Sequence, residues 1–206
     1  MSRAAVSQDP LVYLVDDDDA VRDGLALLLR SVGLRSAGYG DPLRFLQELA
    51  PQAIGCVVLD IRMPGAGGLD VLARLAEASD LPVVMLTGHA SVDLCRRAFK
   101  GGAMEFLQKP VDDDAFLDAV QAAVRTHIAS RGRLAATQAA RDRLARLSGR
   151  EREVLQCVAQ GMSNKEIARL YALSPRTVET YRAHVFEKLE ADTLAQLIRQ
   201  YAALLD

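Results

Sequence analysis

Short apolar runs alternate with stretches of helical spacing through residues 1–127, and this alternation constrains the fold more than any other feature of the sequence. The runs are rich in Val, Leu and Ile. We expect strands at 11–15, 34–39, 55–60, 82–87 and 104–109. Strands that are apolar on both faces and alternate with helices predict a parallel sheet covered on both sides. The sequence therefore predicts an α/β fold, a doubly wound five-stranded parallel sheet in the flavodoxin-like order 2-1-3-4-5.

The helices of this part are predicted from apolar residues that recur every three or four positions and from residues that favour a helix start. Asp41 precedes a proline and is predicted to cap the second helix. Asp19 is predicted to cap the first helix, which would leave Asp18 as a plain loop residue. The fourth helix is marked by Val92 and Phe99, with Cys95 between them.

Residues 147–206 carry no strand pattern and instead contain three helix start signals. Ser148 and Ser163 each have a Glu three positions later, which fits a capping box, and Ser174 precedes a proline. The predicted helices span about 149–160, 164–171, 175–190 and 193–204. A two-residue turn between the second and third helices is typical of a helix-turn-helix. We therefore expect a small all-α domain here.

Charge is unevenly distributed along the chain, although the net charge is only −2. Residues 1–127 carry 12 Lys and Arg against 18 Asp and Glu, residues 128–146 carry five Arg against one Asp, and residues 147–206 carry eight of each sign. This distribution indicates two domains with different partners. We expect a first domain at 1–127, a helical linker at 128–146 in which a break near Gly132 is left open, and a second domain at 147–206.

The composition is that of an ordinary globular protein, with half of the residues hydrophobic and a quarter charged. No apolar run approaches the roughly 20 residues that span a bilayer, and the N-terminal residues lack the apolar core of a signal peptide. The three cysteines are widely spaced and show no zinc-site spacing, as expected in a reducing compartment. The sequence therefore predicts a cytoplasmic protein without a membrane partner.

Polar residues follow the predicted strands at their carboxyl ends, where open parallel sheets form their sites. The predicted strand order brings five of them to one rim: Asp16, Asp17, Asp60, Thr87 and Lys109. Clustered carboxylates are tolerated around a hard cation, and Mg²⁺ prefers such oxygen ligands. A carboxylate beside Mg²⁺ can also act as a nucleophile towards a phosphoryl group. Asp60 suits that role because it is a single carboxylate at the end of a central strand.

Four short motifs contain these residues, in the order V-D-D, D-x-x-M-P, L-T-G-H and F-L-Q-K-P. Together they resemble the receiver domain of two-component systems, the CheY-like family, over about residues 9–127. The resemblance implies that Asp60 is the phospho-acceptor. It also implies that Mg²⁺ is held by Asp16, Asp17, Asp60 and the backbone carbonyl of Arg62. A haloacid-dehalogenase-type phosphatase is the nearest enzyme alternative, but it needs an Asp where Arg62 stands. The chain is therefore not expected to be an enzyme beyond its own phosphoryl transfer and slow self-dephosphorylation.

The same resemblance assigns roles to the later motifs. Lys109 would contact the phosphoryl group and precede a cis peptide bond to Pro110. Thr87 would swing to the phosphoryl oxygen while Phe106, the aromatic switch residue, turns inward. The alternatives are a strand-end hydroxyl for Thr87 and a plain core aromatic for Phe106. His89 is expected to lie beside the site without a catalytic role.

Residues 147–206 resemble the LuxR/FixJ-type helix-turn-helix on the blocks R-E-x-E-V-L, G-x-S-N-K-E-I-A and S-P-R-T-V-E-x-Y-R. At 100° per residue, the third helix has one buried stripe and one outer face. The stripe comprises Val178, Tyr181, Val185 and Leu189. The outer face comprises Arg176, Thr180, Ala183 and Glu187. We expect this outer face to enter the major groove of double-stranded DNA.

Individual DNA contacts follow from side-chain chemistry. Arg176 could bind guanine or a phosphate, and Thr180 and Ala183 could contact a thymine methyl group. Glu179, on the flank, could accept from cytosine or orient Arg176, and Arg182, near the buried stripe, is expected to extend to a backbone phosphate. The remaining candidate phosphate contacts are Asn164, Lys165, Thr177 and Lys188. The alternative is that these are ordinary solvent-facing residues of a small bundle.

Taken together, the chain resembles a FixJ-type two-component response regulator. The expected function is a transcriptional regulator that a sensor histidine kinase phosphorylates on Asp60, which promotes homodimerisation and DNA binding. RNA polymerase is a further candidate partner. The competing hypotheses are a constitutive interaction module with an unphosphorylated receiver and an RNA-binding protein. The presence of both Asp60 and Lys109 argues against the first, and the lack of exposed aromatic stacking residues argues against the second.

Overall fold

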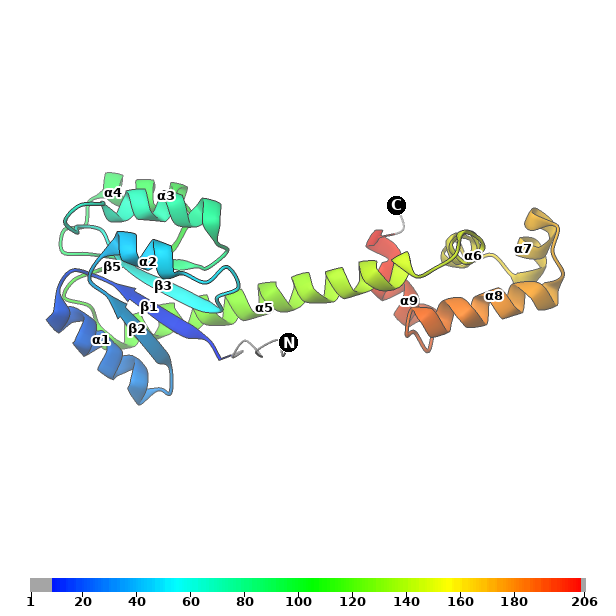
Figure 1. Cartoon of the computed structure of the whole chain (residues 1–206), viewed down its shortest axis with the longest axis horizontal. Coiled ribbons are helices and arrows are strands. Elements are labelled where there is room, and N and C mark those ends of the chain that lie inside the picture. The colour runs from blue at the N-terminus through cyan, green and yellow to red at the C-terminus, as the bar shows by residue number, and fades with distance from the viewer. Residues whose placement is uncertain (1–8, 205–206) are drawn as a thin grey trace. The chain divides into compact units, whose positions relative to one another are not determined.

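The computed structural model describes residues 9–204 of the chain (Figure 1). Two compact units are present, of which the first ends at Arg131 and the second begins at Gly132. Among the described residues, no helix combines the length and the apolar character needed to cross a membrane.

A parallel sheet forms the centre of the first unit. Over residues 9–204 its five strands are β1 (Leu11–Val15), β2 (Arg35–Tyr39), β3 (Gly55–Asp60), β4 (Val83–Thr87) and β5 (Ala103–Gln108). Their order is β2-β1-β3-β4-β5, and all neighbouring pairs are parallel. Every residue of β3 and β4 is buried, as expected for central strands covered on both faces. The predicted α/β fold and strand order are confirmed.

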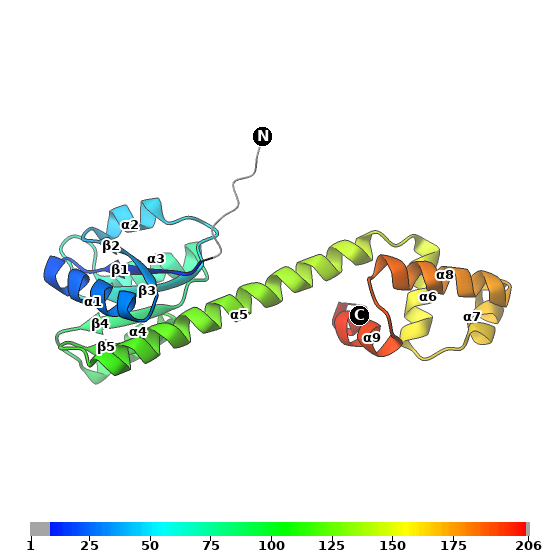
Figure 2. The ribbon, with the colours of Figure 1, turned by 90° about the horizontal axis from the view of Figure 1, so that it is seen from below.

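Helices cover both faces of this sheet (Figures 1 and 2). They are α1 (Asp19–Ser31), α2 (Pro42–Glu48), α3 (Gly68–Ala78), α4 (Val92–Lys100) and α5 (Asp113–Ala145). On one face, Leu29 of α1 and Phe116 of α5 pack against one set of alternating strand residues. On the other face, Phe45 of α2 and Val71 of α3 pack against the second set. Two separate cores result because successive side chains of a strand point to opposite faces.

The apolar residues that predicted α4 are not the ones that hold it on the sheet. Val92 is 78% exposed and Phe99 is 50% exposed, whereas Ala98 is fully buried. Leu94 also packs against the core, and Ser91 caps the helix by accepting a hydrogen bond from the Leu94 N–H. The helix was therefore predicted correctly, but two of the residues that predicted it, Val92 and Phe99, lie on the surface.

The start of α1 corrects the predicted roles within the acidic run. The Asp18 carboxylate accepts hydrogen bonds from the backbone N–H groups of Ala20 at 2.9 Å and Val21 at 3.4 Å, so Asp18 is the N-cap. Asp19 is instead the first helical residue, and its carboxylate pairs with Arg22 one turn later. The prediction of Asp19 as the cap and Asp18 as a plain loop residue was wrong. With four consecutive Asp residues, the pattern alone does not reveal which one has the extended backbone of a cap.

α5 continues from Asp113 to Ala145 without the break that was left open near Gly132. Its last turns belong to the second unit. There, Ala140 and Leu144 pack in one cluster with Leu155 and Tyr201. The core of the second unit therefore includes residues of the predicted linker.

The remaining elements of the second unit, within the described range, are helical. They are α6 (Gly149–Ala159), α7 (Asn164–Tyr171), α8 (Pro175–Lys188), α9 (Leu194–Tyr201) and the 3₁₀ turn η1 (Ala202–Leu204). Both predicted capping boxes are formed, by Ser148 with Glu151 and by Ser163 with Glu166. The turn between α7 and α8 passes through Ala172, which has a left-handed backbone with φ 53°. The predicted helix-turn-helix is thus formed by α7 and α8.

Candidate functional site

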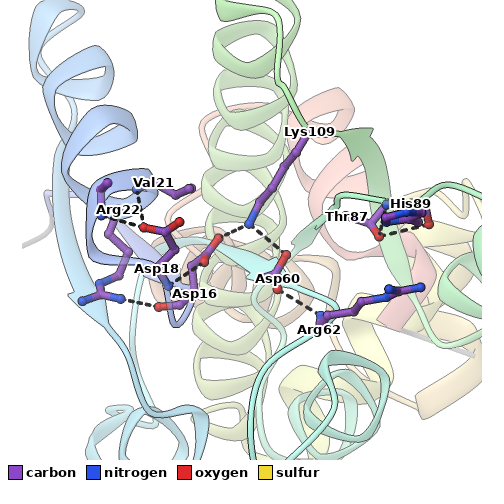
Figure 3. Close-up of polar contacts among 10 residues, drawn as sticks. Asp16, Asp18, Val21, Arg22, Asp60, Arg62, Thr87, His89 and Lys109 are labelled. Carbon is purple, nitrogen blue, oxygen red and sulfur yellow. Dashed lines mark hydrogen bonds and ion pairs between the residues drawn. The ribbon is translucent and has the colours of Figure 1, made fainter.

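The carboxyl ends of the strands bring the predicted rim residues together (Figure 3). In the register of β1 and β3, Val15 lies opposite Leu59, so the residues that follow, Asp16 and Asp60, are neighbours. Lys109 follows β5, and its side chain points between the two carboxylates. The chain order of these residues alone did not place them in contact. The confirmed strand order does.

Lys109 bridges two buried carboxylates. Its Nζ atom lies 2.5 Å from Asp16 Oδ2 and 3.0 Å from Asp60 Oδ1. The side chains of Asp16 and Asp60 are only 4% and 6% exposed, and that of Lys109 is 22% exposed. Buried ionic groups of this kind need partners, because taking a charge out of water costs several kcal/mol. One ammonium group for two carboxylates leaves a net negative charge at the rim.

Burial and charge act in opposite directions on the ionisation of this cluster. Burial raises the pKa of Asp60 above its ordinary value, although the hydrogen bond and charge of Lys109 oppose the shift. Burial alone would lower the pKa of Lys109, but its hydrogen bonds to Asp16 and Asp60 outweigh that effect and raise the pKa. Lys109 is therefore a stable cation, whereas the Asp60 carboxylate is poorly solvated for its charge.

A third carboxylate completes an oxygen-rich group that fits a divalent cation. Asp17 is exposed at the same rim, and one ligand atom from each of Asp16, Asp17 and Asp60 lies within 4.8 Å of the others. The backbone of Arg62 is adjacent, since its N–H donates to Asp60 Oδ2 at 2.9 Å while its side chain is exposed. The donors are all oxygens and the net charge is negative. This chemistry suits Mg²⁺, which prefers carboxylate oxygens and water.

Thr87 is the last residue of β4 and Phe106 lies two residues before the end of β5; among the described residues, the hydroxyl of Thr87 bonds to the His89 backbone and not to Asp60. The Thr87 hydroxyl donates to the backbone carbonyl of His89 and accepts from its N–H, both at 3.2 Å (Figure 3). Phe106 is half-buried and packs against the core beneath α2 and α3. His89 takes part through its backbone, and its side chain is not among these contacts. The expected cis peptide bond between Lys109 and Pro110 is present.

Arg22 is a member of the site that the sequence reasoning did not identify. Its guanidinium donates to the backbone carbonyl of Asp16 at 2.5 Å and also pairs with Asp19. Asp16 Oδ1 in turn accepts from the Asp18 N–H at 3.0 Å. Arg22 thus fixes the backbone of the acidic loop from the first turns of α1. An Arg three positions after Asp19 was a visible signal for the ion pair but not for the contact with Asp16.

In the second unit, α8 presents the predicted outer face to solvent. Arg176, Thr180, Ala183 and Glu187 are exposed, while Val178, Val185 and Leu189 are fully buried. Several candidate contacts have local hydrogen bonds. Thr180 Oγ1 donates to the Arg176 carbonyl at 3.1 Å, and Thr177 Oγ1 lies 2.8 Å from Ser174 Oγ.

The other candidate DNA contacts vary in exposure. Lys165 and Glu179 are exposed, and Asn164, Thr177 and Arg182 are partly buried. Lys188 differs from all of these, because its Nζ atom donates to both oxygens of the buried Glu151, at 2.8 and 2.7 Å. The Lys188 side chain is nevertheless 38% exposed, and its role as a phosphate contact stays a prediction.

Family profiles match both units. Residues 12–121 match the response regulator receiver domain, and residues 145–201 match the bacterial regulatory proteins of the luxR family. The transcriptional regulatory protein FixJ of Bradyrhizobium diazoefficiens is 42% identical over 189 residues, which cover 91% of this chain and 92% of that protein. The chain belongs to the FixJ-type response regulators.

Other known proteins are similar to nearly the whole chain. Nodulation protein W of the same organism is 39% identical over 96% of this chain and 88% of its own length. Among solved structures, the response regulator StyR matches with a TM-score of 0.86 at 36% identity and covers 95% of this chain and 99% of its own. This response regulator therefore combines a receiver domain with a LuxR-type DNA-binding domain, an arrangement that fits a transcriptional regulator.

Proposed function

We propose that phosphorylation of Asp60 by a sensor histidine kinase switches this response regulator, in the cytoplasm, between states of low and high affinity for double-stranded DNA. The observation that carries the proposal is the buried cluster of Asp16, Asp60 and Lys109. Such a cluster is a poor way to stabilise a fold, because apolar residues of the same size stabilise at least as well. Perturbed carboxylates beside a fixed cation at a strand-end rim are typical of functional sites.

In the proposed reaction, a carboxylate oxygen of Asp60 attacks the phosphorus of a phosphohistidine on the kinase. The new O–P bond forms as the P–N bond breaks, and the imidazole leaves with the electron pair. Lys109 already contacts Asp60 at 3.0 Å and would donate to the phosphoryl oxygens. Mg²⁺, held by Asp16, Asp17, Asp60 and the Arg62 carbonyl, would offset negative charge on those oxygens. Beyond this transfer and slow hydrolysis of the aspartyl phosphate, we propose no enzymatic activity.

The proposed switch begins at Thr87. A phosphoryl group on Asp60 adds strong acceptor oxygens at the rim. The Thr87 hydroxyl would exchange its present bonds with the His89 backbone for a bond to one of these oxygens. Phe106 is only half-buried and would move inward in the space that this change opens. The surface of α4, β5 and α5 would then change and favour a homodimer.

DNA binding is proposed for α8, whose outer face would enter the major groove. Arg176 lies near its N-terminus, where a recognition helix is closest to the bases, and Glu179 lies one turn further on. Thr180 and Ala183 are small enough to contact a thymine methyl group. Arg182, Asn164, Lys165 and Thr177 would bind phosphates, which position the helix but carry no sequence information. A dimer would place two such helices on paired half-sites, from which contact with RNA polymerase could follow.

Dimerisation tests the proposal. We expect sedimentation of the full chain to show a shift from monomer to dimer when acetyl phosphate and Mg²⁺ are added. Asp60→Asn should abolish that shift, because the amide is not a nucleophile for phosphorus. Asp18→Asn is the matched control, since it changes a carboxylate of the same loop that caps α1, and it should retain the shift. Dimer formation by Asp60→Asn on the same treatment would refute the proposed switch.

A further inference from the structure

Glu151 is the centre of an ionic cluster that joins α6 to the end of α8. It lies in the first turn of α6 and is only 4% exposed. Its Oε2 atom accepts from the Ser148 N–H at 2.7 Å, which completes the capping box. Both carboxylate oxygens also accept from Lys188 Nζ, and His184 Nδ1 lies 3.8 Å from Oε1. One buried carboxylate therefore fixes the start of α6 and contacts two residues of α8.

The hydrogen bonds to Glu151 hinder Lys188 from binding another partner. If Lys188 turned away to bind a DNA phosphate, Glu151 would keep its contacts with Ser148 but only the distant His184 as a cationic partner. A buried carboxylate without its cation is strongly disfavoured. The same bonds hold the pKa of Glu151 down to about 2, chiefly through the hydrogen bond from Lys188. The charge of Lys188 is therefore largely compensated inside the domain.

The position of Lys188 in α8 links this cluster to the DNA-facing residues. Lys188 is the last residue of α8, and Arg176 is the second, so they are about 18 Å apart along the axis at 1.5 Å per residue. Val178 packs with α6 and α7 in one apolar cluster, while Val185 and Leu189 pack in another. Apolar packing is non-directional and permits some rotation of a helix about its axis. A bidentate ionic contact from α6 restricts that rotation at the C-terminal end of α8.

We infer that Lys188 is a positioning residue that acts through Glu151 to set the orientation of the recognition helix, and that it is not a phosphate contact. The inference rests on the proposed DNA-binding role of α8 and deepens it. The ion pair thereby contributes to sequence discrimination, which depends on the orientation of α8. It contributes little to the general attraction for DNA, which depends on phosphate contacts.

The dependence of DNA affinity on salt separates the two roles. Loss of one phosphate contact makes the fall of log affinity with log salt less steep by about 0.9. It also weakens the binding of all DNA sequences alike. The experiment uses the full chain with Mg²⁺ and beryllofluoride. It compares a duplex selected from a random library by the wild type with a scrambled duplex of equal length. We expect Lys188→Met to leave the slope unchanged and to lower the ratio of the two affinities by at least about fivefold, the lower end of typical coupling between sites.

Three further variants sharpen the test. Glu151→Gln is nearly isosteric, keeps an acceptor for the Ser148 N–H and removes no positive charge, so its expected fall in the affinity ratio cannot come from a lost phosphate contact. Lys188→Arg should restore the ratio, because a guanidinium can also bind the Glu151 carboxylate in a bidentate manner. Lys165→Met is the matched phosphate-contact control and should lower the slope by about 0.9 with the ratio unchanged. Far-ultraviolet circular dichroism would verify that each variant is folded.

Either of two results with DNA would overturn the inference. One is a Lys188→Met variant whose slope falls by about 0.9 while both duplexes lose affinity equally. The other is a folded Glu151→Gln variant that keeps the wild-type ratio. A measurement without DNA complements these tests. NMR titration of the carboxyl groups should show a Glu151 pKa below its ordinary value in the wild type and a pKa closer to the ordinary value in Lys188→Met. An ordinary Glu151 pKa in the wild type would also refute the ion pair. Absence of any DNA binding by the wild type would instead refute the proposed function, while the titration would still test the ion pair.

Discussion

Replacing Lys109 with Met should destabilise the receiver domain, and the loss should depend on Mg²⁺ and pH. Met has a similar length and apolar stem, so the substitution mainly removes the ammonium group between Asp16 and Asp60. The two carboxylates would then lie close together at the rim without the cation that now contacts both. Among the described residues, no other cationic side chain forms an ion pair with either carboxylate.

The magnitude follows from the two contact distances. At 2.5 and 3.0 Å, with an effective dielectric constant of about 20, the Coulomb attractions are about 7 and 6 kcal/mol. Desolvation of the ions offsets most of this, and breaking a buried pair typically costs about 3–5 kcal/mol. Because Lys109 is 22% exposed, we expect a value near the lower end, about 3 kcal/mol at pH 7. Protonation of the carboxylates relieves the penalty, so it should be smaller at pH 5.

Hydrogen-exchange mass spectrometry provides the assay, because the most protected amides of β1 and β3 report the free energy of unfolding of the receiver domain alone. Lys100→Met, at the exposed end of α4, is the control and should cost less than about 0.5 kcal/mol. Millimolar Mg²⁺ should stabilise Lys109→Met more than the wild type, since the ion would bind the same uncompensated carboxylates. A cost below about 1 kcal/mol at pH 7, or equal stabilisation of both proteins by Mg²⁺, would refute this reasoning.

Three other perturbations have definite expected outcomes. In the same exchange assay, Asp18→Ala should lower the free energy of unfolding by about 1 kcal/mol, because it removes the α1 cap. Asp19→Ala should lower it by only a few tenths of a kcal/mol. The reverse order would indicate that Asp19 is the cap. The folded pKa of Glu151 is about 2, below its ordinary value of 4.5, so its stabilisation is present above about pH 4.5 and is lost as the pH falls towards 2. Allowing for solvent screening, the loss should be about 1–2 kcal/mol, measured by exchange in α6, and Glu151→Gln should abolish this pH dependence. His127→Ala should cost about 1–3 kcal/mol in the exchange of β3, because the buried His127 Nδ1 accepts the Gly55 N–H at 3.1 Å; an unchanged β3 would argue against that bond.

The sequence predicted the fold of the receiver well because several independent signals agreed. Central strands such as β3 are apolar throughout, and the strand-end polar residues mark the rim in a fixed order. Once the strand order is known, the neighbourhood of Asp16, Asp60 and Lys109 follows from parallel register. What could not be predicted was which hydrogen bonds these side chains make. The present bonds of Thr87 to the His89 backbone, for example, depend on a turn whose geometry no pattern encodes.

The failures have identifiable physical causes. In α4, Val92 and Phe99 carried the apolar spacing but lie on the surface, because Leu94 and Ala98 form the side of the helix that packs against the core. Apolar spacing alone does not reveal that a small residue such as Ala98 lies on the side of the helix that packs against the core. In α8, the role of Lys188 as a phosphate contact stays a prediction, but the sequence did not reveal its ion pair with Glu151. Its partner Glu151 is 37 residues away, and only the packing of α6 on α8 brings the two together.

Direct detection of phosphorylation tests the central claim, that Asp60 is the switch of a DNA-binding regulator. The full chain would be treated with acetyl phosphate and Mg²⁺, analysed by intact-mass and peptide mass spectrometry, and titrated in parallel with the selected duplex. We predict that the wild type gains one phosphoryl group on the peptide that contains Asp60 and binds the duplex more tightly. Asp60→Asn should show neither change. A phosphoryl group on another residue, or an equal gain in DNA affinity by Asp60→Asn, would contradict the account.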